Sequence, residues 1–131
     1  MKQILVTGCR GQLGNELQLL APQYADTCRF HFTDREELDI TDRRAVFDFI
    51  ESHSIAIVIN CAAYTAVDRA EEDEALCDLL NHIAPGYLAE AVASVGGTMV
   101  HVSSDYVFDG TAHIPYAEDD ATNPQTAYGR T

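Results

Sequence analysis

The sequence predicts an α/β fold, a doubly wound parallel sheet with helices on both faces. Short apolar runs alternate with segments of helical periodicity, in the order β-α-β-α-β-α-β. The run from Ile55 to Ala63 is almost continuously apolar, which is typical of a strand covered on both faces of a parallel sheet. Three glycines, Gly8, Gly11 and Gly14, separate the first strand from the first helix.

The sheet is expected to be incomplete. In the usual strand order of such a fold, 3-2-1-4-5-6, this chain supplies only 3-2-1-4, with the ligand crevice between strands 1 and 4. Strand 4 then becomes an exposed edge. Such edges recruit partners, and a homodimer is one arrangement that we expect.

Each element has its own local signal. The expected strands are residues 4–6, 29–33, 55–63 and 98–103. The first helix is predicted from about Leu13 to Ala21, where Pro22 ends it. Thr41 has the character of an N-cap for the second helix, and Pro85 is expected to kink or split a third helix over residues 73–95.

Composition excludes several classes of protein. The chain has 131 residues, 47% of them hydrophobic, and a net charge of −13, so it is expected to be globular and to bind no nucleic acid. No apolar run is long enough to span a membrane, and the N-terminus lacks the pattern of a signal peptide. The four cysteines and five histidines lack disulfide or metal-ligand spacing. We therefore expect a cytoplasmic protein with reduced thiols and no metal site.

The glycine loop predicts a phosphate-binding turn. Gly8, Gly11 and Gly14 lie between a strand and a helix, where glycine allows the backbone to approach a pyrophosphate and the helix offers free N–H groups. The spacing is G-x-x-G-x-x-G rather than the generic G-x-G-x-x-G, so the position of the loop carries more weight than the motif.

An acidic residue strengthens this interpretation. Asp34 stands about 20 residues after Gly14, at the end of the second strand, where a Rossmann-type domain places a carboxylate for the adenosine ribose. Arg35 follows it, and Arg10 lies inside the loop. Either arginine could pair with a 2′-phosphate, so the cofactor is predicted to be NADPH or NADH.

Further strings carry a family resemblance. They are LDI at 38–40, NCAAYTAVD at 60–68, SSDYVFDG at 103–110 and YGRT at 128–131. With the glycine loop, the chain resembles the extended short-chain dehydrogenases/reductases, and within them the dTDP-4-dehydrorhamnose reductases, over all 131 residues. The resemblance implies NAD(P)H-dependent reduction of the 4-keto group of dTDP-4-dehydro-L-rhamnose to dTDP-L-rhamnose, a sugar nucleotide used in cell-surface polysaccharide biosynthesis. Because members of that subgroup are longer, residues 1–131 are expected to form the NAD(P)-binding domain without the C-terminal substrate-binding part.

The resemblance also implies roles for individual residues. The pyrophosphate would be held at Gly11, Gln12 and Leu13, within the loop that Gly8 and Gly14 shape. The remaining cofactor contacts implied are Asp39 and Ile40 at the adenine, and Ala63, Tyr64 and Thr65 at the nicotinamide-side ribose and phosphate. Ser104 and Asp105 would contact substrate.

Two of these residues are predicted to be catalytic. Ser104 would hydrogen-bond the substrate carbonyl, and Tyr128, which also lies at the cofactor, would be the acid of a Tyr-x-x-x-Lys motif. The lysine of that motif would stand at position 132, and the sequence ends at Thr131. We therefore expect little or no reductase activity from this 131-residue chain alone.

Other interpretations stay open at this stage. The chain could come from another nucleotide-sugar epimerase or dehydratase, or from a non-catalytic NADP-binding regulatory subunit of the same fold. Asn81 could bind backbone or water near the site, or lie on a helix surface. The acidic run Glu71–Glu74 is expected to be a solvated first turn of a helix.

Overall fold

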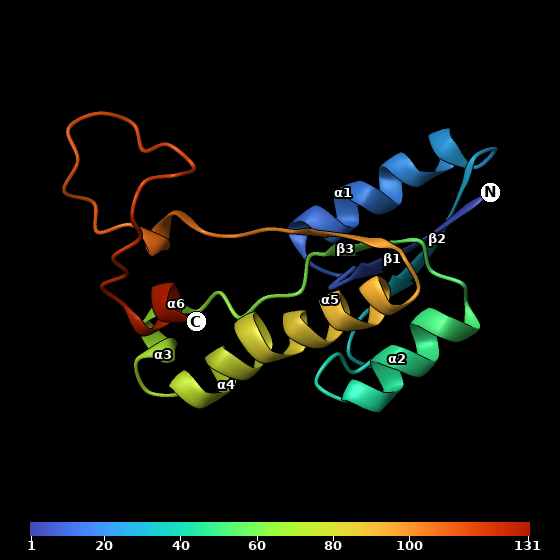
Figure 1. Cartoon of the computed structure of the whole chain (residues 1–131), viewed down its shortest axis with the longest axis horizontal. Coiled ribbons are helices and arrows are strands. Elements are labelled where there is room, and N and C mark those ends of the chain that lie inside the picture. Colours follow the sequence, from blue (N-terminus) through green and yellow to red (C-terminus); the bar gives the residue numbers. More distant parts are fainter.

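A four-stranded parallel sheet forms the centre of the computed structural model, which describes all 131 residues (Figure 1). Its strands are β1 (Lys2–Thr7), β2 (Cys28–Thr33), β3 (Ile57–Asn60) and β4 (Thr98–His101). Helix α1 (Gln12–Leu20) covers one face, and α2 (Arg43–Ser52) and α5 (Ala84–Ser94) cover the other. This arrangement confirms the predicted doubly wound α/β fold.

The predicted strand order was wrong. The observed order is β2-β1-β3-β4, so β3 pairs with β1 and β2 lies at an edge, whereas 3-2-1-4 would have placed the second strand inside the sheet. Composition accounts for the difference. The strand β2 (Cys28–Thr33) includes Arg29 and His31 and is only partly buried, which suits an edge. In β3, every second residue is buried and the others are partly buried, which suits a central strand. The strand order therefore changes direction between β1 and β3, because β2 lies on one side of β1 and β3 on the other. In folds of this kind the ligand crevice forms at that point, so it lies between β1 and β3 rather than between strands 1 and 4.

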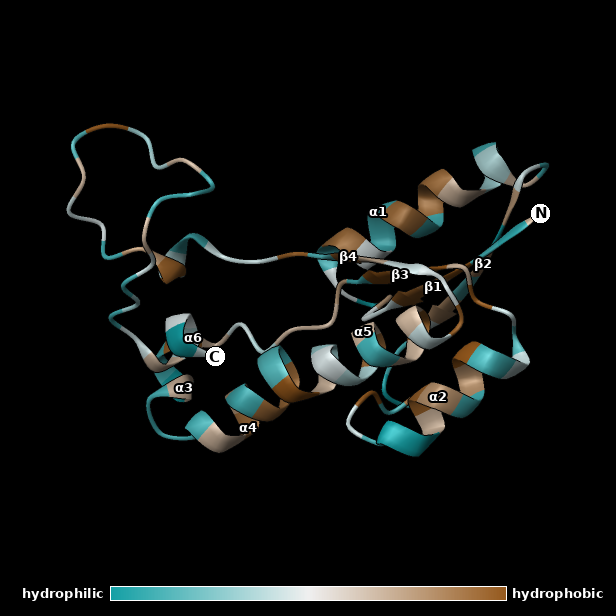
Figure 2. Ribbon diagram, viewed as in Figure 1, coloured by the Kyte–Doolittle hydropathy of each residue, from teal (hydrophilic) through white to brown (hydrophobic).

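The core lies between the sheet and the helices α2 and α5. Leu5 and Val58 from the two central strands pack against Val46 and Ile50 of α2 and Leu88 of α5, all at most 1% exposed. Figure 2 shows β1 and β3 in hydrophobic colours between the helical layers. This packing holds the carboxyl ends of the central strands in a constant position.

The second helix begins one residue later than predicted. Its N-cap is Asp42, whose carboxylate accepts a hydrogen bond from the Ala45 N–H at 3.1 Å, rather than Thr41. Thr41 instead donates both its hydroxyl and its N–H to the Asp39 carboxylate. Both residues are N-cap formers, and only the turn geometry decides between them.

The predicted long helix is divided, as expected from Pro85. It consists of α4 (Glu74–Asp78), the π-helical turn η2 (Leu79–Ile83) and α5, with Pro85 in the first turn of α5. Proline has no N–H to donate to the preceding turn, which explains the break. The π-helical geometry itself was not predicted, and such turns often mark functional sites.

The remaining elements are short. They are the 3-10 turns η1 (Ala21–Tyr24) and η3 (Asp105–Val107) and the helices α3 (Val67–Ala70) and α6 (Ala127–Arg130). Between η3 and α6 the chain forms a long excursion away from the sheet (Figure 1). A small second cluster of Ala70, Cys77 and Ala127 joins α3, α4 and α6. None of the helices has both the length and the apolar character needed to cross a bilayer.

Candidate functional site

The glycine loop is shaped by close backbone contacts. Gly8 has φ = +63°, and a Cβ there would lie 2.6 Å from the Ala62 backbone nitrogen. A Cβ at Gly14 would lie 2.5 Å from the Cys9 Cα, so Gly14 lets α1 pack directly on the loop. Gly11 is the N-cap of α1, and no side chain caps the helix. The first-turn amides of α1 are therefore left without a side-chain acceptor.

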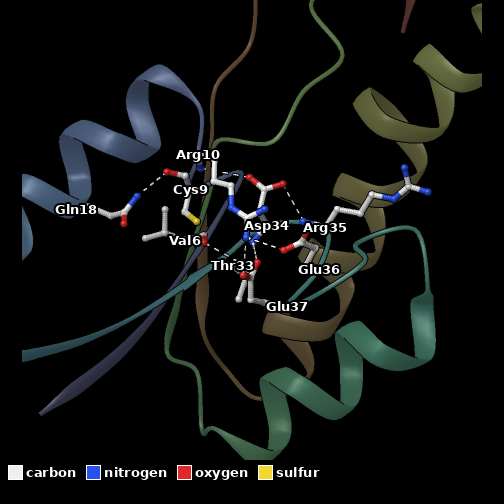
Figure 3. Close-up of polar contacts among 9 residues, drawn as sticks. All are labelled: Val6, Cys9, Arg10, Gln18, Thr33, Asp34, Arg35, Glu36 and Glu37. Atoms are coloured by element: carbon white, nitrogen blue, oxygen red, sulfur yellow. Dashed lines mark hydrogen bonds and ion pairs between the residues drawn. The ribbon is translucent and has the colours of Figure 1, made fainter.

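Asp34 follows β2 and lies beside Arg10 of the glycine loop (Figure 3). Its carboxylate accepts hydrogen bonds from the Arg10 N–H at 3.2 Å and the Arg35 N–H at 2.8 Å. The Glu37 carboxylate accepts from the Asp34 N–H, which lowers the pKa of Glu37. The loop and the end of β2 are thus tied together through backbone amides.

The two arginines of this region differ in their partners. The Arg10 guanidinium donates to Glu36 and Glu37, each at 2.9 Å. These hydrogen bonds, with the charges of both glutamates, raise the pKa of Arg10. Arg35 forms no ion pair, and its guanidinium extends away from the acidic cluster (Figure 3). Arg35 is therefore the cation left free beside Asp34.

A cavity of about 460 Å³ opens between these groups and the helices. Its polar wall includes Thr7, Gly11, Asp34 and Arg35. Its remaining lining is Gly8, Leu38, Asp39, Ile40, Thr41, Cys61, Ala62, Ala63, Leu76, Leu79 and Leu80. The combination of a glycine cradle, a carboxylate and an apolar slot has the chemistry of a site for an adenine nucleotide.

Two groups on this wall have shifted pKa values. Hydrogen bonds from the Thr41 hydroxyl and N–H lower the pKa of Asp39, so this carboxylate stays ionised and held in place. Burial raises the pKa of the Cys61 thiol, which keeps it protonated and unreactive.

A second cavity, of about 250 Å³, adjoins the first at Ala63, which lines both. It contains Ser104 and Tyr128, which come from opposite ends of the long excursion after β4. The Tyr128 ring packs edge-to-face on Tyr106, with centroids 5.3 Å apart. The structure therefore brings the predicted catalytic pair into one pocket beside the nucleotide cavity.

Contacts with α3 and α4 hold α6, and with it Tyr128, in place. The Glu71 carboxylate accepts from the Ala127 N–H at 2.8 Å, and Arg130 donates twice to Glu74. Two members of the acidic run Glu71–Glu74 are thus structural partners of α6 rather than solvated groups only. Arg130 is occupied by Glu74 and is not free to act on Tyr128.

Asn81 in the π-helical turn holds the loop after β3. Its side-chain oxygen accepts from the Tyr64 N–H at 2.7 Å, and its nitrogen donates to the Tyr64 carbonyl at 3.0 Å. Of the two interpretations considered for Asn81, the structure shows the backbone-binding one.

Not every predicted site residue lines a cavity. Those that do are Gly8, Gly11, Asp34, Arg35, Asp39, Ile40, Ala63, Ser104 and Tyr128. Gln12 and Leu13 form the first turn of α1 behind Gly11, and Gly14 is buried against Cys9. Tyr64 packs against the small Ala70 cluster, Thr65 is exposed, and Asp105 lines a separate hollow with Tyr106.

Sequence reasoning missed some residues of the site. Leu76, Leu79 and Leu80 form an apolar wall of the first cavity. Thr7, Asn60 and His101, at the carboxyl ends of three strands, are joined by side-chain hydrogen bonds. The polar residues that end otherwise apolar strands were the available signal.

Comparison with known proteins supports this picture. The family model described as "RmlD substrate binding domain" matches residues 1–131. The chain belongs to this family. Among curated relatives of this RmlD-type chain, a probable dTDP-4,6-dihydroxy-2-methyloxan-3-one 4-ketoreductase of Streptomyces antibioticus is 48% identical over 97% of the chain and 43% of the relative. A dTDP-4-dehydrorhamnose reductase of Streptomyces griseus is 44% identical over 97% of the chain and 41% of the relative. The chain thus spans less than half the length of these relatives.

Solved structures show the same relationship. A dTDP-4-dehydrorhamnose reductase of Clostridium acetobutylicum superimposes with a TM-score of 0.92 at 46% identity, over 98% of this chain and 45% of that one. One from Bacillus anthracis, solved in complex with NADP, gives a TM-score of 0.93 at 34% identity, over 99% and 46%. The RmlD-type fold therefore extends over nearly the whole of this chain.

Proposed function

We propose that this chain is the NAD(P)H-binding domain of a reductase that converts the 4-keto group of a dTDP-linked deoxysugar, dTDP-4-dehydro-L-rhamnose, into an alcohol. The observation that carries the proposal is the pair of adjoining cavities. One joins a glycine cradle to Asp34, and the other holds Ser104 and Tyr128. The names of relatives, several of them dTDP-sugar reductases, and the relative solved with NADP support the choice of substrate and cofactor.

The proposed cofactor contacts follow the wall of the first cavity. The amides of Gln12 and Leu13, behind Gly11, bind the pyrophosphate, and Asp34 accepts hydrogen bonds from the adenosine ribose. The remaining contacts are Asp39 and Ile40 at the adenine, and Ala63, Tyr64 and Thr65 on the nicotinamide side. The glycine loop fits a pyrophosphate, because no side chain caps the first-turn amides of α1.

The proposed chemistry needs a hydrogen-bond donor and an acid at the ketone oxygen. NAD(P)H supplies the hydride when bound. The Ser104 hydroxyl oxygen accepts from the Tyr106 N–H at 3.1 Å, so its own hydrogen is available to donate to that oxygen as negative charge develops there. Tyr128, in the same cavity, then donates the phenolic proton. Asp105 would contact the sugar beside Ser104.

A phenol with an ordinary pKa of about 10 needs a neighbouring cation to transfer protons efficiently near neutral pH. Arg130 is held by Glu74, and the Tyr-x-x-x-Lys pattern places a lysine at position 132, outside these residues. We therefore expect the 131-residue polypeptide to bind NAD(P)H but to reduce the keto sugar very slowly. Rapid turnover by this polypeptide would contradict the need for a residue at position 132.

The proposal also covers the cellular compartment, the oligomeric state and the domain organisation of the protein. The four cysteines are free, which supports a reducing, cytoplasmic compartment. The edge of β4 is unpaired within these residues, with Val100 and Val102 about half exposed, and either a further strand of the protein or a second copy in a homodimer would cover it. Residues 1–131 act as the cofactor-binding domain, and a substrate-binding part lies outside them.

Arg35 provides the sharpest test of cofactor binding. It lines the first cavity beside Asp34 without an acidic partner, so R35A is expected to weaken NADPH binding about 10- to 100-fold by removing a charged contact to the 2′-phosphate. Binding of NADH, which lacks that phosphate, is expected to be unchanged. Calorimetric titration with both nucleotides makes the comparison.

The control is R44A, because Arg44 is 91% exposed on α2 and pairs only with Asp48. Equal losses for NADPH and NADH in R35A would show that Arg35 does not select the phosphate. Failure of the unmodified chain to bind either nucleotide would remove the proposed function itself.

A further inference from the structure

A row of polar side chains crosses the sheet at its carboxyl end. Thr33, Thr7, Asn60 and His101 are register partners on β2, β1, β3 and β4 respectively. The preceding rows are mostly apolar, for example Val6, Ile59 and Val100. The row lies where the two cavities meet the sheet, because Thr7 lines the first cavity and His101 the second.

Asn60 is the buried centre of this row. It is 1% exposed, and burying an amide costs free energy unless both of its ends are hydrogen-bonded. Both are. The Thr7 hydroxyl donates to Asn60 Oδ1 at 2.5 Å, and Asn60 Nδ2 lies 3.0 Å from His101 Nδ1.

This chain of hydrogen bonds selects the form of His101. The Asn60 Nδ2 group can only donate, so His101 Nδ1 accepts, and the neutral ring carries its proton on Nε2. His101 makes no other hydrogen bond, and Nε2 faces away from Asn60. The sheet thus presents a histidine with one defined donor at the wall that Ser104 and Tyr128 share.

We propose that His101 is a cofactor-binding residue whose Nε2–H donates a hydrogen bond to the carboxamide oxygen of the nicotinamide. The inference rests on the proposed function. A dinucleotide anchored at Asp34 and Gly11 extends past Ala63, which lines both cavities, and its nicotinamide half enters the one that contains His101. Ser104 and Tyr128 are assigned to the substrate oxygen, whereas His101 lines the same cavity with a donor that makes no other hydrogen bond. Asn60 and Thr7 act as positioning residues behind it.

The tautomer can be measured without any turnover. Long-range proton–nitrogen correlation of the histidine rings, with His101 identified by its loss in H101Q, is expected to show a neutral ring protonated at Nε2. Adding NADPH should shift that nitrogen. Adding 2′-phospho-ADP-ribose, which lacks the nicotinamide, should not. A ring protonated at Nδ1, or no shift with NADPH, would overturn the assignment.

Affinity gives an independent readout. H101F, which removes the Nε2–H donor and keeps a flat ring, is expected to weaken NADPH binding about 3- to 10-fold, the effect of one hydrogen bond between neutral groups, and to leave 2′-phospho-ADP-ribose binding unchanged. H113F, on the exposed excursion, is the matched control and should bind both ligands normally. A second variant, N60A, should weaken NADPH binding similarly and mix the tautomers of His101.

The outcomes separate the two proposals. Equal weakening of both ligands by H101F would mean that His101 acts through the fold, which overturns this inference while the proposed function stands. If the unmodified chain binds 2′-phospho-ADP-ribose but H101F leaves NADPH affinity unchanged, the inference also fails alone. If the unmodified chain binds neither ligand, the proposed function fails, and this inference fails with it.

Discussion

Gly8 is the residue at which the loop after β1 touches the chain leaving β3. Its φ is positive, and a Cβ at this position would lie only 2.6 Å from the Ala62 backbone nitrogen, so no side chain fits. Two different costs combine there, a left-handed backbone and a steric overlap with backbone atoms that cannot move aside. Other glycines of the chain carry these costs singly or not at all, which allows them to be separated.

A glycine-to-alanine series is expected to do so. G8A should lower the free energy of unfolding by more than about 2 kcal/mol and abolish NADPH binding. G96A, where φ is +74° and space is open, should cost about 1 kcal/mol through the backbone alone. G86A, exposed in α5 with nothing within 4 Å, should be neutral or stabilising by up to about 1 kcal/mol. Denaturant unfolding of the three variants measures the differences, and a G8A protein as stable as G96A would contradict the steric argument.

At the scale of elements, the excursion from η3 to α6 has its own internal framework. Asp109 accepts hydrogen bonds from the Thr111 N–H and hydroxyl, the Tyr116 hydroxyl and the Asn123 side chain. The Phe108 and Tyr116 rings stack with centroids 4.3 Å apart. One carboxylate thus organises a segment that has no strand and no long helix, and that segment connects Ser104 to Tyr128.

This framework predicts a local response to mutation and to acid. The Thr111, Asn123 and Tyr116 hydrogen bonds hold the pKa of Asp109 well below its ordinary 3.8. The stabilisation is therefore fully present above that value and is lost as the pH falls through the lowered pKa. D109A is expected to open the excursion at neutral pH, which limited proteolysis would detect as faster cleavage within residues 105–126. D119A, in the same segment with no such bonds, is the control, and equal cleavage rates would refute the role of Asp109.

At the scale of the whole molecule, the sheet carries histidines in two separate settings. The carboxyl end carries the polar row and both cavities. On the outer strand β2, His31 contacts His53 of α2, with ring centroids 5.0 Å apart, and its Nε2 lies 2.9 Å from Gln3 Oε1. This second histidine site lines neither cavity and connects β1, β2 and α2.

The stability of the fold is expected to depend on pH through His31. Burial, and then the nearby His53 and Arg29, lower the pKa of His31 below its ordinary 6.5. A lowered pKa means that the folded state binds fewer protons than the unfolded state, so stability should fall as the pH drops below 6.5 and level off below the folded-state pKa. Thermal unfolding across this range should show that slope, and H31Q should reduce it. H113Q should leave the slope intact, and an unchanged slope in H31Q would exclude His31 as its source.

The sequence by itself determined the class of fold and part of the lining of the first cavity. The glycine loop, Asp34 and the alternation of strands and helices are local patterns, and each acts through residues close together in the chain. Ser104 and Tyr128 were reached only through a family resemblance, and the structure places them in one cavity.

Only the tertiary structure decided the strand order, the π-helical turn with Asn81, and the row from Thr7 through Asn60 to His101. Strand pairing depends on which faces and edges the helices bury, and that balance is summed over the whole molecule rather than written in any one segment. The histidine at the end of β4 meets the Asn60 amide only because β3 ends beside it in register, and Asn60 meets Thr7 only because β1 ends on its other side.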